Sequence, residues 1–192
     1  MATLSEETDP SVSQINDNRF LFAGGPVQPW RLVLNDAGGN TQVSANSQAS
    51  SLSKLLVQAL DNKAQDDTIQ ATWSGEANLS IQGNPVDLTA KAAKGMALAF
   101  NYNVLAQDAN KVILSSGCGV DCTGELDITT SLQSRVGQGW QQANIAPGCF
   151  AQAGTNMQKV HIPFSLAADA GLFMQLSEIK IVDAESAASC HL

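Results

Sequence analysis

The chain has 192 residues, of which 44% are hydrophobic and 15% charged, and its formal net charge is -8. This length suits one domain, and the composition is too apolar for a disordered chain and lacks the apolar run that a transmembrane helix needs. The negative charge repels phosphate backbones and anionic lipid headgroups, so we expect neither nucleic acid nor a membrane as a partner.

The first 18 residues are rich in Ser, Thr, Asp and Glu around Pro10 and show no periodic apolar pattern. This composition is typical of a domain edge, and we interpret residues 1–18 as a linker from the preceding part of a longer chain. We assign residues 19–183 to a single domain. Residues 184–192 are rich in Ser and Ala and are expected to form a flexible C-terminal tail.

Residues 51–62 carry two overlapping patterns. Leucines at 52, 55, 56 and 60, together with Ala59, match the i, i+3, i+4 stripe of an amphipathic helix. The same stretch also fits a strand from Leu55 to Asp61. The pattern alone leaves both structures open.

From residue 68 onward the chain is dominated by strand patterns. Over residues 97–104 the large apolar side chains fall on even positions and the polar ones on odd positions, which indicates a strand with one buried and one wetter face. Similar short runs, separated by turns rich in Gly, Pro and Asn, are residues 68–73, 78–81, 111–115, 140–145, 160–166 and 172–182. Short strands without intervening helices predict an all-β fold, an antiparallel β-sandwich.

Four cysteines allow three complete disulfide pairings, among which the sequence does not choose. A local bridge between Cys118 and Cys122 is a candidate because Gly119 eases the turn between them, and it would indicate an oxidising compartment. Four reduced, buried thiols are the alternative. The spacing of the cysteines is not that of a structural zinc site.

Catalytic patterns are missing. His191 is penultimate in the tail, and His161 has the strand parity of a solvent-facing residue, so neither marks a Ser-His-Asp site. Glu125, Asp127 and Glu178 lie on or beside predicted strands without the spacing of a glycosidase pair. Loop carboxylates such as Asp36 could supply calcium ligands, but no calcium loop is recognisable, so we predict no catalytic residue, no metal site and no cofactor.

The few aromatic residues point to one candidate surface for a sugar. Tyr102 and Trp73 share parity with apolar neighbours and are expected in the core, whereas Trp140 shares parity with polar residues. A pyranose packs its C–H face on an exposed ring while amides bond its hydroxyls. The predicted carbohydrate-binding residues are therefore Trp140, Asn101, Asn103, Gln142 and Asn144.

Eight short motifs in order carry a resemblance to a known family. They are Pro29-Trp30-Arg31-Leu32, Trp73-Ser74-Gly75, residues 96–102, residues 118–122, residues 126–129, Gly139-Trp140, Cys149-Phe150 and Pro163-Phe164. Together they resemble the extra C-terminal domain of bacterial family 3 glycoside hydrolases of the exo-β-1,3/1,4-glucanase and β-glucosidase type. Asn103 departs from the arginine expected there.

The resemblance implies a galactose-binding-domain-like jelly roll and favours a strand for residues 55–61. It also implies a non-catalytic module of a secreted or periplasmic hydrolase, with residues 1–18 leading from the catalytic domains. The family's Ser-Asp-Trp and Lys-His motifs do not occur in this chain. The hydrolytic site is therefore expected outside it.

Two functions follow from this resemblance. In the first, the domain packs on the catalytic domains of the same polypeptide and helps to shape the rim of their active site. In the second, it is an autonomous carbohydrate-binding module for β-glucan. The scarcity of exposed aromatic residues favours the first.

Overall fold

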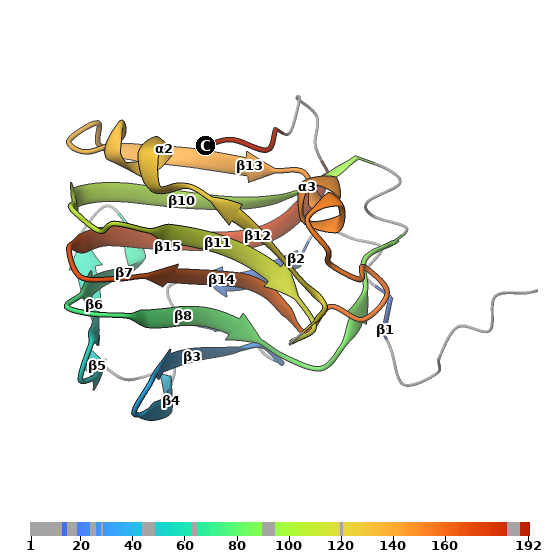
Figure 1. Ribbon diagram of the computed structural model, residues 1–192, viewed down its shortest axis with the longest axis horizontal. Helices are drawn as coiled ribbons and strands as arrows, with labels where there is room; N and C mark the ends of the chain where they lie inside the picture. Colours follow the sequence, from blue (N-terminus) through green and yellow to red (C-terminus); the bar gives the residue numbers. More distant parts are fainter. Residues whose placement is uncertain are drawn as a thin grey trace, which may run out of the picture.

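Two antiparallel sheets contain most of the strands among the described residues. The computed structural model describes residues 13–14, 19–23, 26–27, 29–43, 49–62, 65–89, 95–119, 121–183 and 189–192. The long strands of both sheets run across the view in Figure 1, and buried hydrophobic residues of the two sheets form one core. The predicted all-β sandwich is confirmed.

Sheet 1 contains seven strands, and β15 lies near its centre. The order is β13 (Trp140–Ile145), β10 (Met96–Gln107), β15 (Leu172–Asp183), β7 (Gln65–Trp73), β6 (Leu55–Asn62) and β5 (Ala49–Leu52), with β2 (Arg19–Ala23) also paired to β15.

Sheet 2 contains six strands, and β14 and β8 lie at its centre. The order is β12 (Thr123–Asp127), β11 (Val112–Gly117), β14 (Ile162–Ala168), β8 (Ala77–Gln82), β3 (Arg31–Asp36) and β4 (Gly39–Val43).

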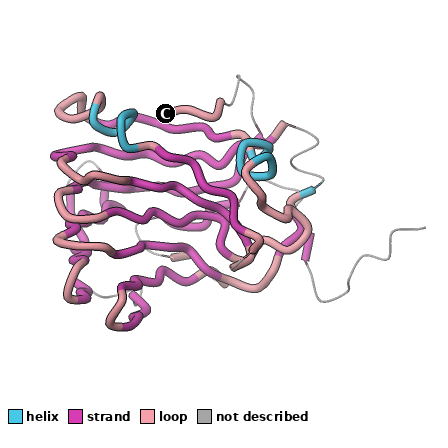
Figure 2. The backbone as a smooth tube through the Cα atoms, in the orientation of Figure 1, coloured by secondary structure: helices cyan, strands magenta, loops and turns pink. Residues whose placement is uncertain are grey.

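Helix is a minor component of the described residues. The short helices α2 (Thr129–Gln133) and α3 (Pro147–Gln152) lie at the edge of the sandwich near β13 (Figure 2). Pro147 occupies the first turn of α3, where its missing N–H costs nothing. No helix in the described part of the chain is long and apolar enough to cross a membrane.

The core lies between the sheets and is built by the inward-facing half of each strand. Phe100 of sheet 1 packs edge-on against Phe164 of sheet 2, with ring centroids 5.3 Å apart. Trp73 is buried, and its Nε1 donates to the carbonyl oxygen of Ala77 at 3.0 Å, which fixes the turn between β7 and β8. Tyr102 is also buried, and burial raises the pKa of its hydroxyl against the opposing effect of Arg135. The expectation that Trp73 and Tyr102 are core residues is confirmed.

Residues 51–62 form strands rather than a helix. A tight turn separates β5 from β6, and Leu55 and Val57 point into the core while Leu56 between them is 37% exposed. This alternation has period two, so pairing with β7 prevails over the helical spacing of the leucines.

Parts of both predicted terminal segments are described. Within residues 1–18, β1 (Ser13–Gln14) pairs in parallel with β9 (Val86–Asp87), and the other residues lie outside the described ones. At the other end, Ser189 forms a bridge with Ile145, and its N–H donates to Asn144. Residues 189–192 are thereby attached to β13.

Candidate functional site

The five residues predicted to bind carbohydrate lie together on the outer face of sheet 1. The register of β10 and β13 places Trp140 opposite Asn103 and Gln142 opposite Asn101. Asn144 follows two residues further along, opposite Ala99. Trp140 is half-buried at the edge of the sheet, so its ring is only partly available to a ligand.

A row of amides extends from Trp140 across sheet 1. Cross-strand pairs connect Trp140 with Asn103, Gln175, Gln70 and Gln58 in succession. Nδ2 of Asn103 donates to Oε1 of Gln175 at 3.1 Å, and Nε2 of Gln175 donates to Oε1 of Gln70 at 3.2 Å. In this amide row, the side chains already use part of one another's hydrogen-bonding capacity.

Asn101 is engaged in a similar way. Its Nδ2 donates to Oε2 of Glu178 at 3.4 Å, and Nζ of Lys180 lies 3.4 Å from the same oxygen. The amide predicted to face a sugar thus belongs to a surface ion-pair cluster.

An apolar row runs beside the amide row on the same face. Ala106, Phe173, Thr72 and Leu56 are successive cross-strand partners on β10, β15, β7 and β6. Leu56 is 37% exposed and Leu105, next to Ala106, is 38% exposed. The outer face of sheet 1 therefore combines paired amides with a partly exposed apolar row.

The outer face of sheet 2 carries a groove of about 490 Å³ that sequence reasoning missed. We name this the sheet 2 groove. It crosses five neighbouring strands, from β12 to β3. Its lining residues are Asn35, Asp36, Glu76, Ala77, Asn78, Lys111, Ile113, Ser115, Glu125, Ala167, Ala168 and Asp169.

Small side chains on the central strands make this face hollow. Ala167 of β14 lies between Ile113 of β11 and Asn78 of β8 in the sheet register. In the neighbouring row the cross-strand partners are three serines, of which Ser115 lines the groove while Ser165 and Ser80 are buried. Because the side chains of Ala167 and Ser115 are short, the longer side chains on the flanking strands form the walls of the groove.

Carboxylates and amides dominate the walls of the sheet 2 groove. Glu125 lies on β12 at one side, and Asn35 lies on β3 at the other. The side chains of Glu125 and Glu76 make no hydrogen bond or ion pair with another described residue. Lys111 is the single cation in the lining. The groove therefore offers mainly hydrogen-bond acceptors.

Asp169 and Asp36 in the lining are already held by the chain. Oδ1 of Asp169 accepts from the backbone N–H of Asn110 at 2.8 Å, and Oδ1 of Asp36 accepts from Gly38 at 2.8 Å. Burial alone would raise the pKa of Asp169, but hydrogen bonds from Asn110 and from the Lys111 N–H outweigh it and hold that pKa low. Asp169 is thus fixed in its charged form and orients the loop between β10 and β11.

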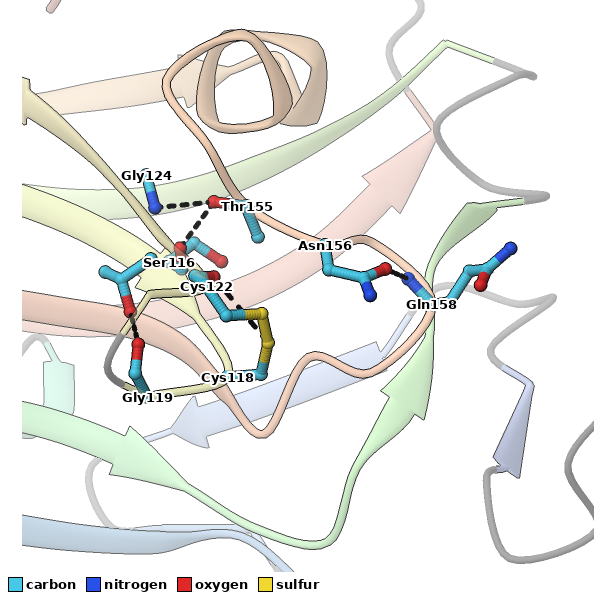
Figure 3. The surroundings of a disulfide bond; sticks show 9 residues. Ser116, Cys118, Gly119, Cys122, Gly124, Thr155, Asn156 and Gln158 are labelled. Atoms are coloured by element: carbon cyan, nitrogen blue, oxygen red, sulfur yellow. Dashed lines mark hydrogen bonds between the residues drawn. A yellow bond between two sulfur atoms is a disulfide. The ribbon is translucent and has the colours of Figure 1, made fainter.

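The predicted disulfide residues Cys118 and Cys122 are bonded, and they close the β11–β12 hairpin (Figure 3). Nearby, Oγ1 of Thr155 accepts from the Gly124 N–H at 2.8 Å and donates to the Ser116 carbonyl at 2.6 Å. These contacts tie the hairpin to the segment that follows α3.

A second disulfide joins Cys149 of α3 to Cys190 near the C-terminus. The alternative of four reduced thiols was wrong, because all four cysteines pair. The 41-residue separation of this pair gave no local turn signal, so the sequence could not favour it.

Among the residues that the structure describes, no group of three His, Cys, Asp or Glu side chains is placed to hold a metal ion. His161 lies beside the disulfide hairpin, where its backbone N–H donates to Gly117 and its carbonyl accepts from Gly83.

The family model Exop_C, described as galactose-binding domain-like, matches residues 28–181. No protein with a curated description matches the sequence.

Solved structures share the fold. The extra C-terminal domain (X) of the exo-1,3/1,4-beta-glucanase from a Pseudoalteromonas species superposes with a TM-score of 0.72 at 17% identity, covering 90% of this chain and 96% of that domain. The same whole enzyme gives a TM-score of 0.74 at 19% identity, and the match covers all of this chain. It spans only 23% of the enzyme.

A family 11 carbohydrate-binding module from Clostridium thermocellum, solved with a beta-1,3-1,4-mixed-linked tetrasaccharide, is similar at a TM-score of 0.56 and 12% identity. The match covers 87% of this chain and 96% of that module. At such identities the likeness establishes the galactose-binding-like sandwich fold expected from the sequence motifs.

Proposed function

The chain belongs to the Exop_C family of galactose-binding domain-like domains, and from this membership we propose that it serves a β-glucan-degrading glycoside hydrolase of family 3 as a non-catalytic accessory module. In this proposal the module packs on the catalytic domains of the same polypeptide and helps to shape the rim of their active site. The observation that carries it is the likeness to an extra domain that makes up about a quarter of an exo-glucanase.

We place the packing surface on the outer face of sheet 1. Phe173 and Leu56 of the apolar row and the adjacent Leu105 are partly exposed there, and an interface core uses apolar side chains of this kind. The paired amides beside them suit the polar rim of such an interface. The partner that packs on this face in our proposal is the hydrolase portion of the polypeptide, because the matched enzyme has more than three quarters of its length outside this domain.

We further propose a secreted or periplasmic location. Two disulfides in one small domain support it, because such bonds persist in oxidising compartments and are rare in the cytosol.

The test compares the full-length protein with a version from which this domain is deleted, using a small aryl glucoside and a β-glucan as substrates. If the domain shapes the active-site rim, deletion lowers hydrolysis of both substrates. In the full-length protein, Phe173→Glu should have the same effect in weaker form, with Val136→Glu, at an exposed apolar residue outside both rows, as the matched control. Unchanged hydrolysis of the aryl glucoside after deletion would rule out the rim role.

An autonomous carbohydrate-binding module is the second candidate, and the sheet 2 groove is the observation that favours it. A module that only holds substrate near the enzyme leaves aryl glucoside hydrolysis unchanged on deletion and lowers that of the polymer. Isothermal titration of the 192-residue chain with laminarin measures this affinity directly.

A further inference from the structure

We propose that the sheet 2 groove is a binding site for a neutral, hydroxyl-rich oligosaccharide, which it holds by hydrogen bonds without aromatic stacking. The choice of a β-glucan segment as the ligand rests on the proposed function. The location of the site rests on the groove alone.

The shape of the groove suits a ligand of a few sugar units. Its volume of about 490 Å³ lies within the range of about 300–1,000 Å³ typical of small-molecule sites. Four intervals of about 4.8 Å between its five strands give a width of roughly 19 Å from β12 to β3. The groove is open to solvent along this width, so an extended chain can enter sideways.

The side chains that line the groove favour a ligand that donates hydrogen bonds and carries no negative charge. The free carboxylates of Glu76 and Glu125 accept hydrogen bonds strongly, and sugar hydroxyls are suitable donors. Asn35 and Asn78 add amide groups that both donate and accept, which matches the two-way bonding of a hydroxyl. An anionic polysaccharide would meet these carboxylates with only Lys111 to offset them.

The floor gives the sugar ring an apolar surface. Ile113 and Ala167 are cross-strand neighbours at its centre, and both are partly exposed. The C–H groups of a pyranose can pack on these methyl groups while its equatorial hydroxyls reach the walls. Ser165 donates to Oδ1 of Asn78 at 2.8 Å, which holds that amide with its N–H donors free.

The amide row of sheet 1 is less suited to the same ligand. Gln175 already bonds both Asn103 and Gln70, so a sugar would have to break those bonds first.

The experiment is isothermal titration of the 192-residue chain with laminarihexaose and with a mixed-linked β-1,3-1,4 tetrasaccharide. Ala167→Trp is the first variant, because the added indole occupies the space between Ile113 and Asn78. It should weaken binding by more than about tenfold. Gln70→Trp makes the same kind of change on the central part of sheet 1, and it should leave binding within about twofold of the unchanged chain.

Glu125→Gln is the second variant, and it keeps the shape of the groove while removing one charge. Because bonds to charged acceptors are stronger than neutral ones, we expect binding to weaken about three- to tenfold. Since Glu125 is exposed at the wall, this variant remains informative if Ala167→Trp does not fold, as judged by its circular dichroism spectrum.

The outcomes separate this inference from the proposed function. If binding survives Ala167→Trp, or if it is lost in Gln70→Trp on sheet 1 and not in Ala167→Trp, the groove is not the binding site. Tighter binding of a cationic chitosan oligosaccharide or of an anionic polyuronide overturns the neutral ligand class. If no glucan binds at all, the groove proposal fails, whereas the rim role is still decided by the deletion experiment on the full-length protein.

Discussion

The two outer faces of the sandwich follow the same alternation of inward and outward side chains, yet their central strands carry outward side chains of different size. On sheet 1 the central strands carry long outward residues, such as Gln70 and Gln175, which bond to one another across the strands. On sheet 2 the central strands carry Ala167 and serines at equivalent outward positions. The size of a few outward side chains therefore decides where a ligand could enter.

The difference also divides the proposed roles. The apolar row containing Phe173 and Leu56 gives sheet 1 a surface suited to another protein domain. The carboxylates around the sheet 2 groove, including Glu76 and Glu125, suit a hydroxyl-rich ligand. A module with this division can pack on an enzyme by one face and hold substrate on the other.

The largest effect is expected from the core that both faces share. Phe164 is fully buried and packs on Phe100 of the opposite sheet, so Phe164→Ala should lower the free energy of unfolding by about 3–5 kcal/mol. Denaturant unfolding followed by fluorescence and by circular dichroism measures this. The two probes should report one transition, and separate transitions would show that the faces unfold independently.

The disulfides at the two sheet edges should differ in their contribution to stability. Replacing Cys149 and Cys190 by Ala opens a loop of 41 residues beside β13 and should cost about 4 kcal/mol, on a chain-entropy estimate. Replacing Cys118 and Cys122 by Ala removes a link between residues only four positions apart, beside β12, and should lower the free energy of unfolding by about 2 kcal/mol. Urea titrations of the two double variants test the order, and a larger loss at the β11–β12 hairpin would contradict it.

Acid should lower the stability of the fold by protonating two aspartates on the sheet 2 side of the sandwich. Hydrogen bonds from the side chain and backbone of Thr129 lower the pKa of Asp127, and those from Asn110 and Lys111 lower that of Asp169 against the effect of burial. Since both pKa values lie below the unfolded value of 3.8, their stabilisation is complete above that pH and is lost as the pH falls below it. Asp127→Asn with Asp169→Asn should flatten the decline in stability between about pH 4 and about pH 2. An unchanged slope would show that these bonds do not matter.

The smallest effect is expected at the aromatic residue that the sequence singled out. Trp140 is half-buried at the edge of sheet 1, opposite Asn103, and the groove lies on the other sheet. Trp140→Ala should therefore change glucan affinity less than about twofold in isothermal titration. A tenfold loss would return the site to the residues first predicted.

Much of the sandwich was predictable because its signals are local. The alternation in residues 97–104 identified β10, and the parity of Trp140, Gln142 and Asn144 placed them on an outer face. The short helices α2 and α3 were missed, since five or six residues give too little periodicity to stand out.

The sheet 2 groove could not be predicted from the sequence. It depends on Ala167 of β14 lying between Ile113 and Asn78, which are distant along the chain and become neighbours only through the strand order. The Cys149–Cys190 pair depends on the path of the chain end along β13 in the same way. Pairings over such separations have no local signature.

The most direct test of the account is a nuclear magnetic resonance titration of the ¹⁵N-labelled 192-residue chain with laminarihexaose. We expect the largest shift changes at the backbone amides of β8, β11 and β14, around Asn78, Ile113 and Ala167, with the amides around Gln70 and Trp140 little changed. Changes concentrated on β10, β13 and β15, or no changes at millimolar ligand, would contradict the sheet 2 groove as the carbohydrate site.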